Sequence, residues 1–164
     1  MLLLVLFVVL LAFAIAGMMG APYVPILKRD SDALLALSNL KSGQTLVDLG
    51  SGDGRLLAAA ASQGIHCIGY EINPFMVVIS KVVCWRHRKL VTIKFRNLWS
   101  TPLPPADAIY VFLMPKFMPR LNDKLASEIH KPTVVISYAF EIPGPEAVRR
   151  NVNTYVYEYG QKVN

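Results

Sequence analysis

The residues best suited to chemistry are glycines and carboxylates that follow a short apolar run. Residues 45–49 read Thr-Leu-Val-Asp-Leu, and residues 50–54 read Gly-Ser-Gly-Asp-Gly. The apolar run predicts a strand buried on both faces, and glycines can turn the backbone at φ values that a Cβ opposes. The alanine-rich residues 55–61 predict a helix whose free N–H groups and partial positive charge face the turn. We therefore expect a ligand at the carboxyl end of this strand.

The charge of the turn selects among nucleotide ligands. The dinucleotide fingerprint is Gly-x-Gly-x-x-Gly, whereas Gly50, Gly52 and Gly54 give Gly-x-Gly-x-Gly. Asp48 and Asp53 flank these glycines. Their carboxylates would repel a pyrophosphate and attract the sulfonium and ammonium groups of S-adenosylmethionine, which has no phosphate. The turn therefore favours a methyl donor over a nicotinamide cofactor.

A further carboxylate, Glu71, ends a second short apolar run at residues 66–70. A carboxylate about 20 residues beyond such a turn can accept hydrogen bonds from both ribose hydroxyls of a nucleoside. NAD enzymes share this position. Glu71 therefore indicates a nucleoside cofactor without identifying it.

Helix-like and strand-like segments alternate along the chain. Residues 31–42, 74–89 and 117–129 predict further helices. Further strands are predicted at residues 91–96, 108–113, 133–140 and 154–159. The alternation predicts a Rossmann-like, doubly wound α/β sheet, with the ligand where strand order reverses, beside the first and fourth strands. After Pro145 only one strand is clear, at residues 154–159.

The first 20 residues are almost wholly apolar, and the first charged side chain is Lys28. About 20 helical residues at ~1.5 Å each cover a hydrocarbon core of ~30 Å. A cleaved signal peptide is the alternative, and it would usually begin with basic residues, which are absent here. We expect residues 1–20 to form a transmembrane anchor and residues 21–164 a single catalytic domain. Lys28 and Arg29 then place that domain in the cytoplasm.

Three motifs together resemble one family. Residues 20–25 read Gly-Ala-Pro-Tyr-Val-Pro, residues 48–55 read Asp-Leu-Gly-Ser-Gly-Asp-Gly-Arg, and residues 71–74 read Glu-Ile-Asn-Pro. The chain resembles the small membrane-anchored class I lysine methyltransferases, which include the ATP synthase c-subunit and adenine nucleotide translocase lysine N-methyltransferases and short prokaryotic relatives. The resemblance implies the class I fold, S-adenosylmethionine as cofactor, and a protein acceptor in or near the bilayer.

The site residues follow from the turn, from a comparison with the wider superfamily and from the ends of the predicted strands. Where the wider superfamily usually has an acidic residue near the adenine, this chain has Asn97, whose amide oxygen can accept the same hydrogen bond. The predicted cofactor-binding residues are Asp48, Gly50, Ser51, Gly52, Asp53, Gly54, Glu71, Asn97 and Leu98. Candidates on the acceptor side are Tyr23, Pro25, Pro115, Ser137, Tyr138 and Glu141. No catalytic residue is singled out, and no metal site is predicted.

Composition bounds the possible partners. The net charge is +6, and residues 72–106 contain six lysines and arginines but no acidic residue. Such a stretch is either a solvated face or a surface for anionic lipid headgroups. Nucleic-acid binding is disfavoured, because no interleaved aromatic pattern or RNA-binding module accompanies it. Cys67 and Cys84 lack metal-ligand spacing and fit core positions in a reducing compartment.

Other functions stay open. A methyltransferase with a lipid or small apolar acceptor would account for the apolar start equally well. A degenerate fold used as a membrane-tethered binding module is disfavoured by the intact turn. A nicotinamide oxidoreductase is disfavoured by the carboxylates of the turn. Residues 113–116 lack the Asn/Asp-Pro-Pro-Tyr motif typical of enzymes that methylate exocyclic or amide nitrogens.

Overall fold

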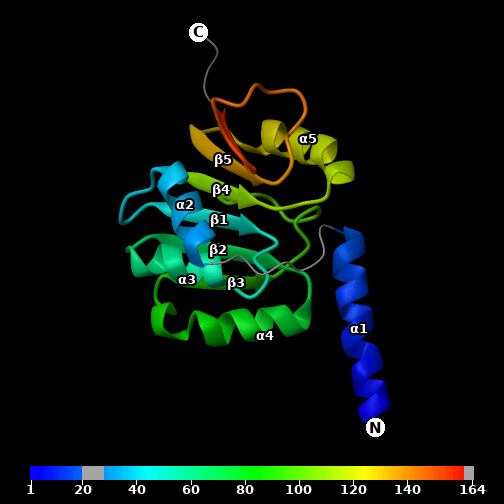
Figure 1. Cartoon of the computed structure of the whole chain (residues 1–164). Helices are drawn as coiled ribbons and strands as arrows, with labels where there is room; N and C mark the ends of the chain where they lie inside the picture. Colours follow the sequence, from blue (N-terminus) through cyan, green and yellow to red (C-terminus); the bar gives the residue numbers. More distant parts are fainter. Residues whose placement is uncertain (20–27, 161–164) are drawn as a thin grey trace.

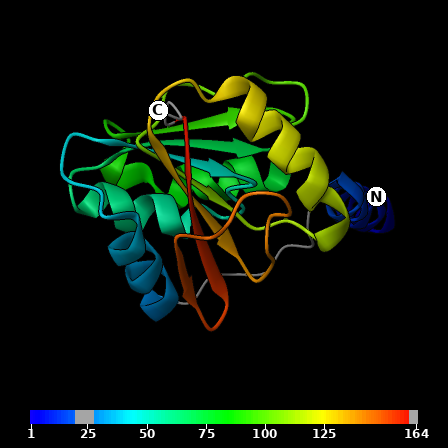
Figure 2. The same cartoon turned by 90° about the horizontal axis from the view of Figure 1, so that it is seen from above.

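The computed structural model describes residues 1–19 and 28–160, and it turns the predicted alternation into one mixed sheet flanked by helices (Figures 1 and 2). The helices are α1 (Leu2–Met19), α2 (Lys28–Ser38), α3 (Arg55–Ser62), α4 (Pro74–Val83) and α5 (Met118–Glu128), with short 3-10 helices η1 (Trp85–His87) and η2 (Pro115–Phe117). The strands are β1 (Thr45–Leu49), β2 (His66–Glu71), β3 (Val91–Phe95), β4 (Ala108–Val111), β5 (Thr133–Tyr138), β6 (Arg149–Asn151) and β7 (Thr154–Tyr159).

The strand order of the sheet is β3-β2-β1-β4-β5-β7-β6. Strands β1 to β5 pair in parallel, while β7 runs antiparallel to β5, and β6 antiparallel to β7. The order reverses between β1 and β4, as the sequence predicts. The carboxyl ends of these two strands therefore meet at the position where open α/β sheets bind ligands.

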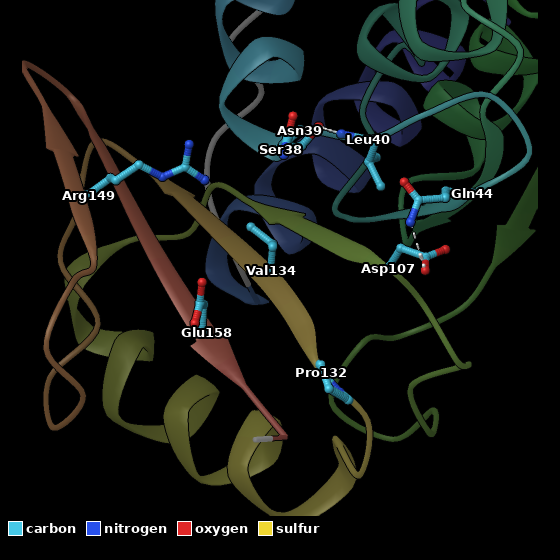
Figure 3. Close-up of a pocket in the computed structure, with 9 residues that line it drawn as sticks. All are labelled: Ser38, Asn39, Leu40, Gln44, Asp107, Pro132, Val134, Arg149 and Glu158. Carbon is cyan, nitrogen blue, oxygen red and sulfur yellow. Dashed lines mark hydrogen bonds between the residues drawn. The ribbon is translucent and has the colours of Figure 1, made fainter. Parts of the chain in front are cut away.

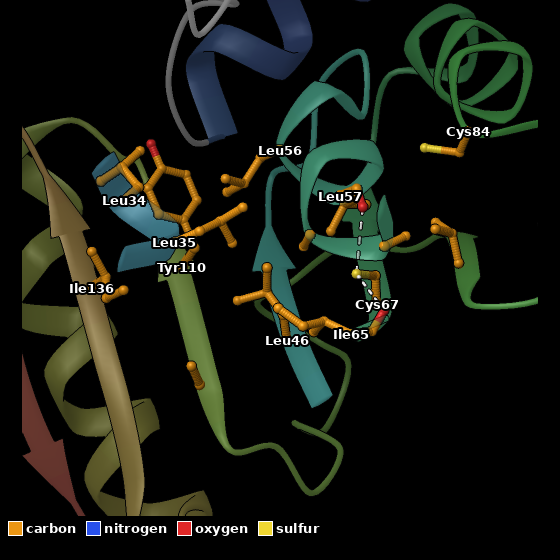
Figure 4. Close-up of a cluster of buried hydrophobic side chains, with 14 of the residues drawn as sticks. Leu34, Leu35, Leu46, Leu56, Leu57, Ile65, Cys67, Cys84, Tyr110 and Ile136 are labelled. Atoms are coloured by element: carbon orange, nitrogen blue, oxygen red, sulfur yellow. Dashed lines mark hydrogen bonds between the residues drawn. The ribbon is translucent and has the colours of Figure 1, made fainter. Parts of the chain in front are cut away.

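Burial follows the expected layering. Every residue of β4, and all of β1 except its first residue, is buried, as expected for strands covered on both faces. One apolar cluster joins α2 and α3 to the sheet (Figure 4). A second lies between the other face and α5. Cys67 and Cys84 are buried and free, which confirms their prediction as core residues.

The closing hairpin is complete, although the sequence predicts only its second strand. Strand β6 reads Arg-Arg-Asn, and all three side chains are exposed. No apolar alternation marks such a strand. Its pairing depends on β7, whose register aligns Arg150 with Tyr155. Backbone pairing therefore extends the sheet at a place that hydrophobic patterning cannot reveal.

The apolar start of the chain forms α1, which contacts α4 at the edge of the sheet toward which the strand arrows point (Figure 1). Large side chains along it are exposed, including Leu3, Leu4 and Phe7. Within residues 1–19 and 28–160, no helix is both long and apolar enough to cross a membrane. The helix is thus confirmed, whereas its role as an anchor is not.

Candidate functional site

The turn after β1 has the conformation that its glycines predict. Gly50, Gly52 and Gly54 have φ values of 99°, 52° and 80°, in the left-handed region that other residues adopt at a cost. The N–H groups of Gly50 and Ser51 donate to the Tyr70 carbonyl at 2.9 and 3.0 Å. The turn is therefore tied to the end of β2 and lies at the carboxyl edge of the sheet.

Two glycines also allow close packing around the turn. A Cβ on Gly54 would lie 2.9 Å from Ser80 Cβ, because α3 begins against α4. A Cβ on Gly69 would lie 2.7 Å from Ser51 Oγ and 2.6 Å from Leu57 Cδ1. Gly69 lies within β2 and has no motif to identify it, so the sequence does not predict its role. Both positions keep the turn close to its neighbours.

Glu71 fixes the turn as well as ending β2. Its Oε2 accepts the Gly52 N–H at 2.8 Å, and its Oε1 accepts the N–H groups of Ile72 and Asn73 at 2.8 and 2.7 Å. Burial raises the pKa of this carboxyl, and the three backbone donors oppose the rise. Carboxylate oxygens have further lone pairs, so these bonds leave acceptors for ribose hydroxyls. The ribose role stays a prediction.

Asp48 is the least satisfied carboxyl at this edge. It is 2% exposed, and no atom of the described residues forms a hydrogen bond with its Oδ1. Burial, with added repulsion from Glu71 and Asp53, raises its pKa to about 8. Asp53 differs, because its Oδ2 lies 2.7 Å from Arg55 Nε. A cation beside Asp48 would favour its ionised form.

Two more buried polar atoms beside the turn have no hydrogen-bond partner among the described residues, namely Ser51 Oγ and Asn73 Nδ2. Buried polar groups are rarely left unpaired, so three orphans at one edge point to a ligand. A ligand with a cationic end and several hydroxyl and amine groups fits this set. S-adenosylmethionine has these groups, and a pyrophosphate would face Asp48, Asp53 and Glu71 together.

The predicted adenine contacts follow β3 at the same edge. Asn97 Oδ1 accepts the N–H of Trp99 at 2.9 Å, so the oxygen expected to face adenine already holds its own loop. Its second lone pair remains an acceptor. Leu98 is 9% exposed and packs in the cluster beneath α5. Their contact with adenine stays a prediction.

The predicted acceptor residues are only partly brought together. Pro115 is exposed and begins η2 after β4, while Ser137 and Tyr138 end the neighbouring β5. The Ser137 hydroxyl is buried and donates to the Phe140 carbonyl at 2.6 Å, so it is committed to its own loop. Glu141 is exposed and pairs with Arg150 of the hairpin. Tyr23 and Pro25 lie outside the described residues.

The predicted Tyr138 belongs to an aromatic group at this edge whose other members, Phe112 and Phe140, the sequence analysis does not predict. The rings of Phe112 and Tyr138 meet edge to face at 5.8 Å, and Phe112 and Phe140 stack at 6.4 Å. Ala139 between them has φ 68°, an unusual value for a residue with a Cβ, and its N–H donates to the Asn153 carbonyl at 2.7 Å. The residue types do not predict this turn, because alanine seldom adopts a left-handed φ value.

The opposite edge of the sheet has a polar cavity of about 300 Å³ (Figure 3). Asp107 in its wall accepts Gln44 Nε2 at 3.3 Å and the Thr45 N–H at 2.7 Å. Arg149 donates to the Leu37 carbonyl at 2.8 Å. These groups find partners within the protein, so the cavity carries weaker signs of a ligand than the glycine turn.

Comparison with known proteins agrees with this geometry. Residues 48–149 match the family described as the ANTKMT methyltransferase domain. The chain is 35% identical to the ATP synthase c-subunit lysine N-methyltransferase of Rattus norvegicus over 124 residues, 74% of this chain and 57% of that one. It is 28% identical to a protein-lysine N-methyltransferase of Saccharolobus islandicus over 148 residues, 84% of this chain and 92% of that one. The chain spans about half the length of the animal relatives it matches.

A solved structure shows the same fold. An RNA methyltransferase from Salinibacter ruber, in complex with S-adenosyl-L-homocysteine, superposes with a TM-score of 0.72 and 28% identity, covering 83% of this chain and 92% of that one. The class I methyltransferase fold predicted from the sequence is thereby confirmed.

Proposed function

We propose that this chain, which belongs to the ANTKMT methyltransferase family, transfers the methyl group of S-adenosylmethionine to a lysine side chain of another protein. The observation that carries the proposal is the buried Asp48, whose Oδ1 has no partner among the described residues, beside a glycine turn at the strand reversal. The choice of lysine as the methyl acceptor rests on the relatives that are lysine methyltransferases.

The chain's own residues account for donor binding. The glycine turn allows the donor to approach the backbone, and Asp48 offers a carboxylate to its cationic end. Glu71 holds the Gly52 N–H and has oxygen lone pairs for the ribose hydroxyls. Leu98 and the backbone beside it would cover the adenine. S-adenosylmethionine itself supplies an activated methyl group.

Methyl transfer needs little acid or base chemistry from the protein. The nucleophile must lie ~3 Å from the methyl carbon and in line with the breaking bond, so positioning supplies much of the acceleration. A lysine amine has a pKa of ~10.4 in water and must lose a proton before it attacks. Desolvation lowers the pKa of an amine. The half-buried rings of Phe112, Tyr138 and Phe140 at this edge would exclude water from such an amine.

The acceptor is proposed to be a membrane protein. One relative is named for the c-subunit of ATP synthase, and the apolar α1 lies at the same edge of this chain as the glycine turn (Figure 1). We propose that α1 holds the protein at a bilayer and that the catalytic domain faces the cytoplasm. A lipid acceptor would be reached from the same position.

A second acceptor class comes from the Salinibacter ruber structure, which is an RNA methyltransferase. The basic side chains after residue 72 would favour RNA by charge. No stacking platform accompanies them in the sequence, and the turn itself is acidic. We therefore rank RNA below lysine.

The test is methyl transfer from tritiated S-adenosylmethionine to isolated membranes by the full chain. We expect the label in protein and, after acid hydrolysis, in methyllysine. Label in the organic extract would make the acceptor a lipid, and ribonuclease-sensitive label would make it RNA. Binding of the donor without any transfer would support the degenerate binding module instead.

A further inference from the structure

The outer face of α4 and η1 is apolar, where the outer face of a helix on a sheet is normally polar. Val78, Val82 and Trp85 follow the spacing of one helical face and are 63%, 70% and 63% exposed. On the inner face Met76 and Val77 are buried. The helix is therefore apolar on two sides, and one of them has no cover among the described residues.

Helix α5 provides the contrast within the same fold. It buries Met118, Leu121 and Leu125 against the sheet. Its outward residues include the exposed Arg120 and Asp123. The ordinary amphipathic pattern is thus present in α5 and absent from α4, so the apolar outer face of α4 is a local feature.

Basic side chains lie within and just after the same two helices. Lys81, Arg86, Arg88 and Lys89 are all exposed, and the Arg88 guanidinium carbon lies 4.6 Å from the centre of the Trp85 ring. No acidic residue occurs between residues 72 and 106. Exposed apolar side chains with tryptophan and nearby basic side chains match the interface of an anionic bilayer. A protein partner would need acidic groups beside an apolar centre.

Helix α1 has a second exposed apolar surface. It contacts α4, and its amino-terminal half extends past α4 on the side away from the sheet (Figure 1). Leu3, Leu4 and Phe7 on that half are 81%, 67% and 62% exposed. Two helices from distant parts of the chain that contact each other therefore both carry exposed apolar side chains.

We propose that the outer face of α4 and η1 lies on the surface of an anionic lipid bilayer, with α1 as a second apolar contact. Val78, Val82 and Trp85 enter the headgroup region, and the nearby basic side chains meet lipid phosphates. The inference deepens the proposed function, because α4 begins at Pro74, directly after the Asn73 cap whose N–H is held by Glu71. The donor turn then lies at one end of the membrane-facing helix, within reach of an acceptor at the bilayer surface.

The chain's two tryptophans make the test specific. Trp99 is half-buried on the α5 side, where its ring lies 5.7 Å from that of Phe117. The full chain would be bound to vesicles of phosphatidylcholine with phosphatidylserine, and fluorescence quenching by brominated lipid measured in Trp99→Phe, which retains Trp85, and in Trp85→Phe, which retains Trp99. We expect strong quenching of Trp85, little of Trp99, and weaker quenching of Trp85 without phosphatidylserine.

Matched charge variants separate the face from the fold. In the Trp99→Phe background, Val82→Asp should remove most of the Trp85 quenching, while Ala126→Asp on the exposed side of α5 should leave it unchanged. Calorimetry should show equal affinity for S-adenosylmethionine in both variants. Equal quenching of the two tryptophans would overturn the proposal, as would self-association in detergent that shields Trp85 from lipid. If the parent protein did not bind S-adenosylmethionine while Trp85 was still quenched, the proposed function would be refuted and the membrane-facing surface would still be supported.

Discussion

Asp107 at the amino edge of the sheet and Asp48 at its carboxyl edge differ in how their carboxylate oxygens are hydrogen-bonded. At the amino edge, both oxygens of Asp107 accept hydrogen bonds, from Gln44 and from the Thr45 backbone. At the carboxyl edge, Asp48 is 2% exposed, its Oδ1 has no partner among the described residues, and its pKa is raised to about 8. A carboxylate satisfied within the chain stabilises the fold, whereas one buried without a partner is ready for a ligand.

The same contrast extends to the glycines. Gly43 at the amino edge and Gly50 at the carboxyl edge have φ values of 88° and 99°, and at each a Cβ would meet no described atom within 4 Å. The two glycines therefore have similar local geometry but lie at opposite edges of the sheet. Matched substitutions at the two edges can therefore separate effects on stability from effects on donor binding.

The largest effect should come from removing Glu71. Glu71→Ala takes away the acceptor of three backbone N–H groups and the proposed ribose contact. Hydrogen bonds to charged groups contribute ~1.5–3 kcal/mol each, so donor affinity should fall by at least ~10-fold. Calorimetry with S-adenosylmethionine measures the donor affinity. The affinity of Glu71→Gln, which keeps acceptors on one oxygen, should fall less. Unchanged affinity in a folded Glu71→Ala protein would remove Glu71 from the site.

The next effect is the pH dependence of donor binding through Asp48. Its pKa is raised from its ordinary value near 4 to about 8, so the ligand-free protein binds a proton there that the unfolded chain has lost. Folding stability therefore falls as the pH rises from the ordinary carboxyl pKa toward 8, because only the unfolded chain releases this proton in that range. A cationic donor requires the ionised form, so its affinity should rise by up to ~10-fold per pH unit below about 8. Titrations across this range should show the slope in the parent and none in Asp48→Asn.

Asp107→Ala should lower stability without changing donor affinity, in contrast to Asp48→Asn. The Thr45 N–H would lose its acceptor, which costs about 1–3 kcal/mol of unfolding free energy when a group is buried, and less where water reaches it. Urea unfolding measures the loss. Donor affinity should not change, because Asp107 lies at the opposite edge. Weaker donor binding in a folded Asp107→Ala protein would mean that the two edges are coupled.

The smallest and most selective effect is the paired glycine substitution. Gly43→Ala and Gly50→Ala should each cost roughly 1–2 kcal/mol of stability, because a Cβ in the left-handed region is strained. Only Gly50→Ala should also weaken donor binding, because the added Cβ would occupy space that the proposed function assigns to the donor. Parallel unfolding and binding measurements test the pair. Similar donor affinities in the two variants would place the donor away from Gly50.

The sequence predicts the turn and the sheet well, because both depend on residue types that few alternatives can replace. Left-handed φ values at Gly50, Gly52 and Gly54 favour glycine, and the buried central strands favour unbroken apolar runs. The bond from Glu71 to Gly52 is not predictable in this way, because a residue type shows that a carboxylate is present but not which N–H it accepts. Residue types therefore predict a ribose role for Glu71, which stays a prediction, but not its hydrogen bonds to the backbone.

Other features depend on tertiary context alone. Strand β6 forms from three exposed polar residues because β7 offers it a partner. The left-handed Ala139 is held by the Asn153 carbonyl, which lies far from it in any local pattern. The sequence also does not predict the exposed apolar face of α4, because periodicity identifies an apolar face but not which side of the helix the sheet covers.

The most direct test of the donor site is calorimetric titration of the detergent-purified full chain with S-adenosylmethionine and with NADH in parallel, for the parent and for Asp48→Asn. We predict that the parent binds S-adenosylmethionine and not NADH, and that Asp48→Asn binds S-adenosylmethionine more weakly at a pH of about 8, where the parent carboxyl ionises. Binding of NADH in preference, or an S-adenosylmethionine affinity that Asp48→Asn leaves unchanged at that pH, would contradict the account.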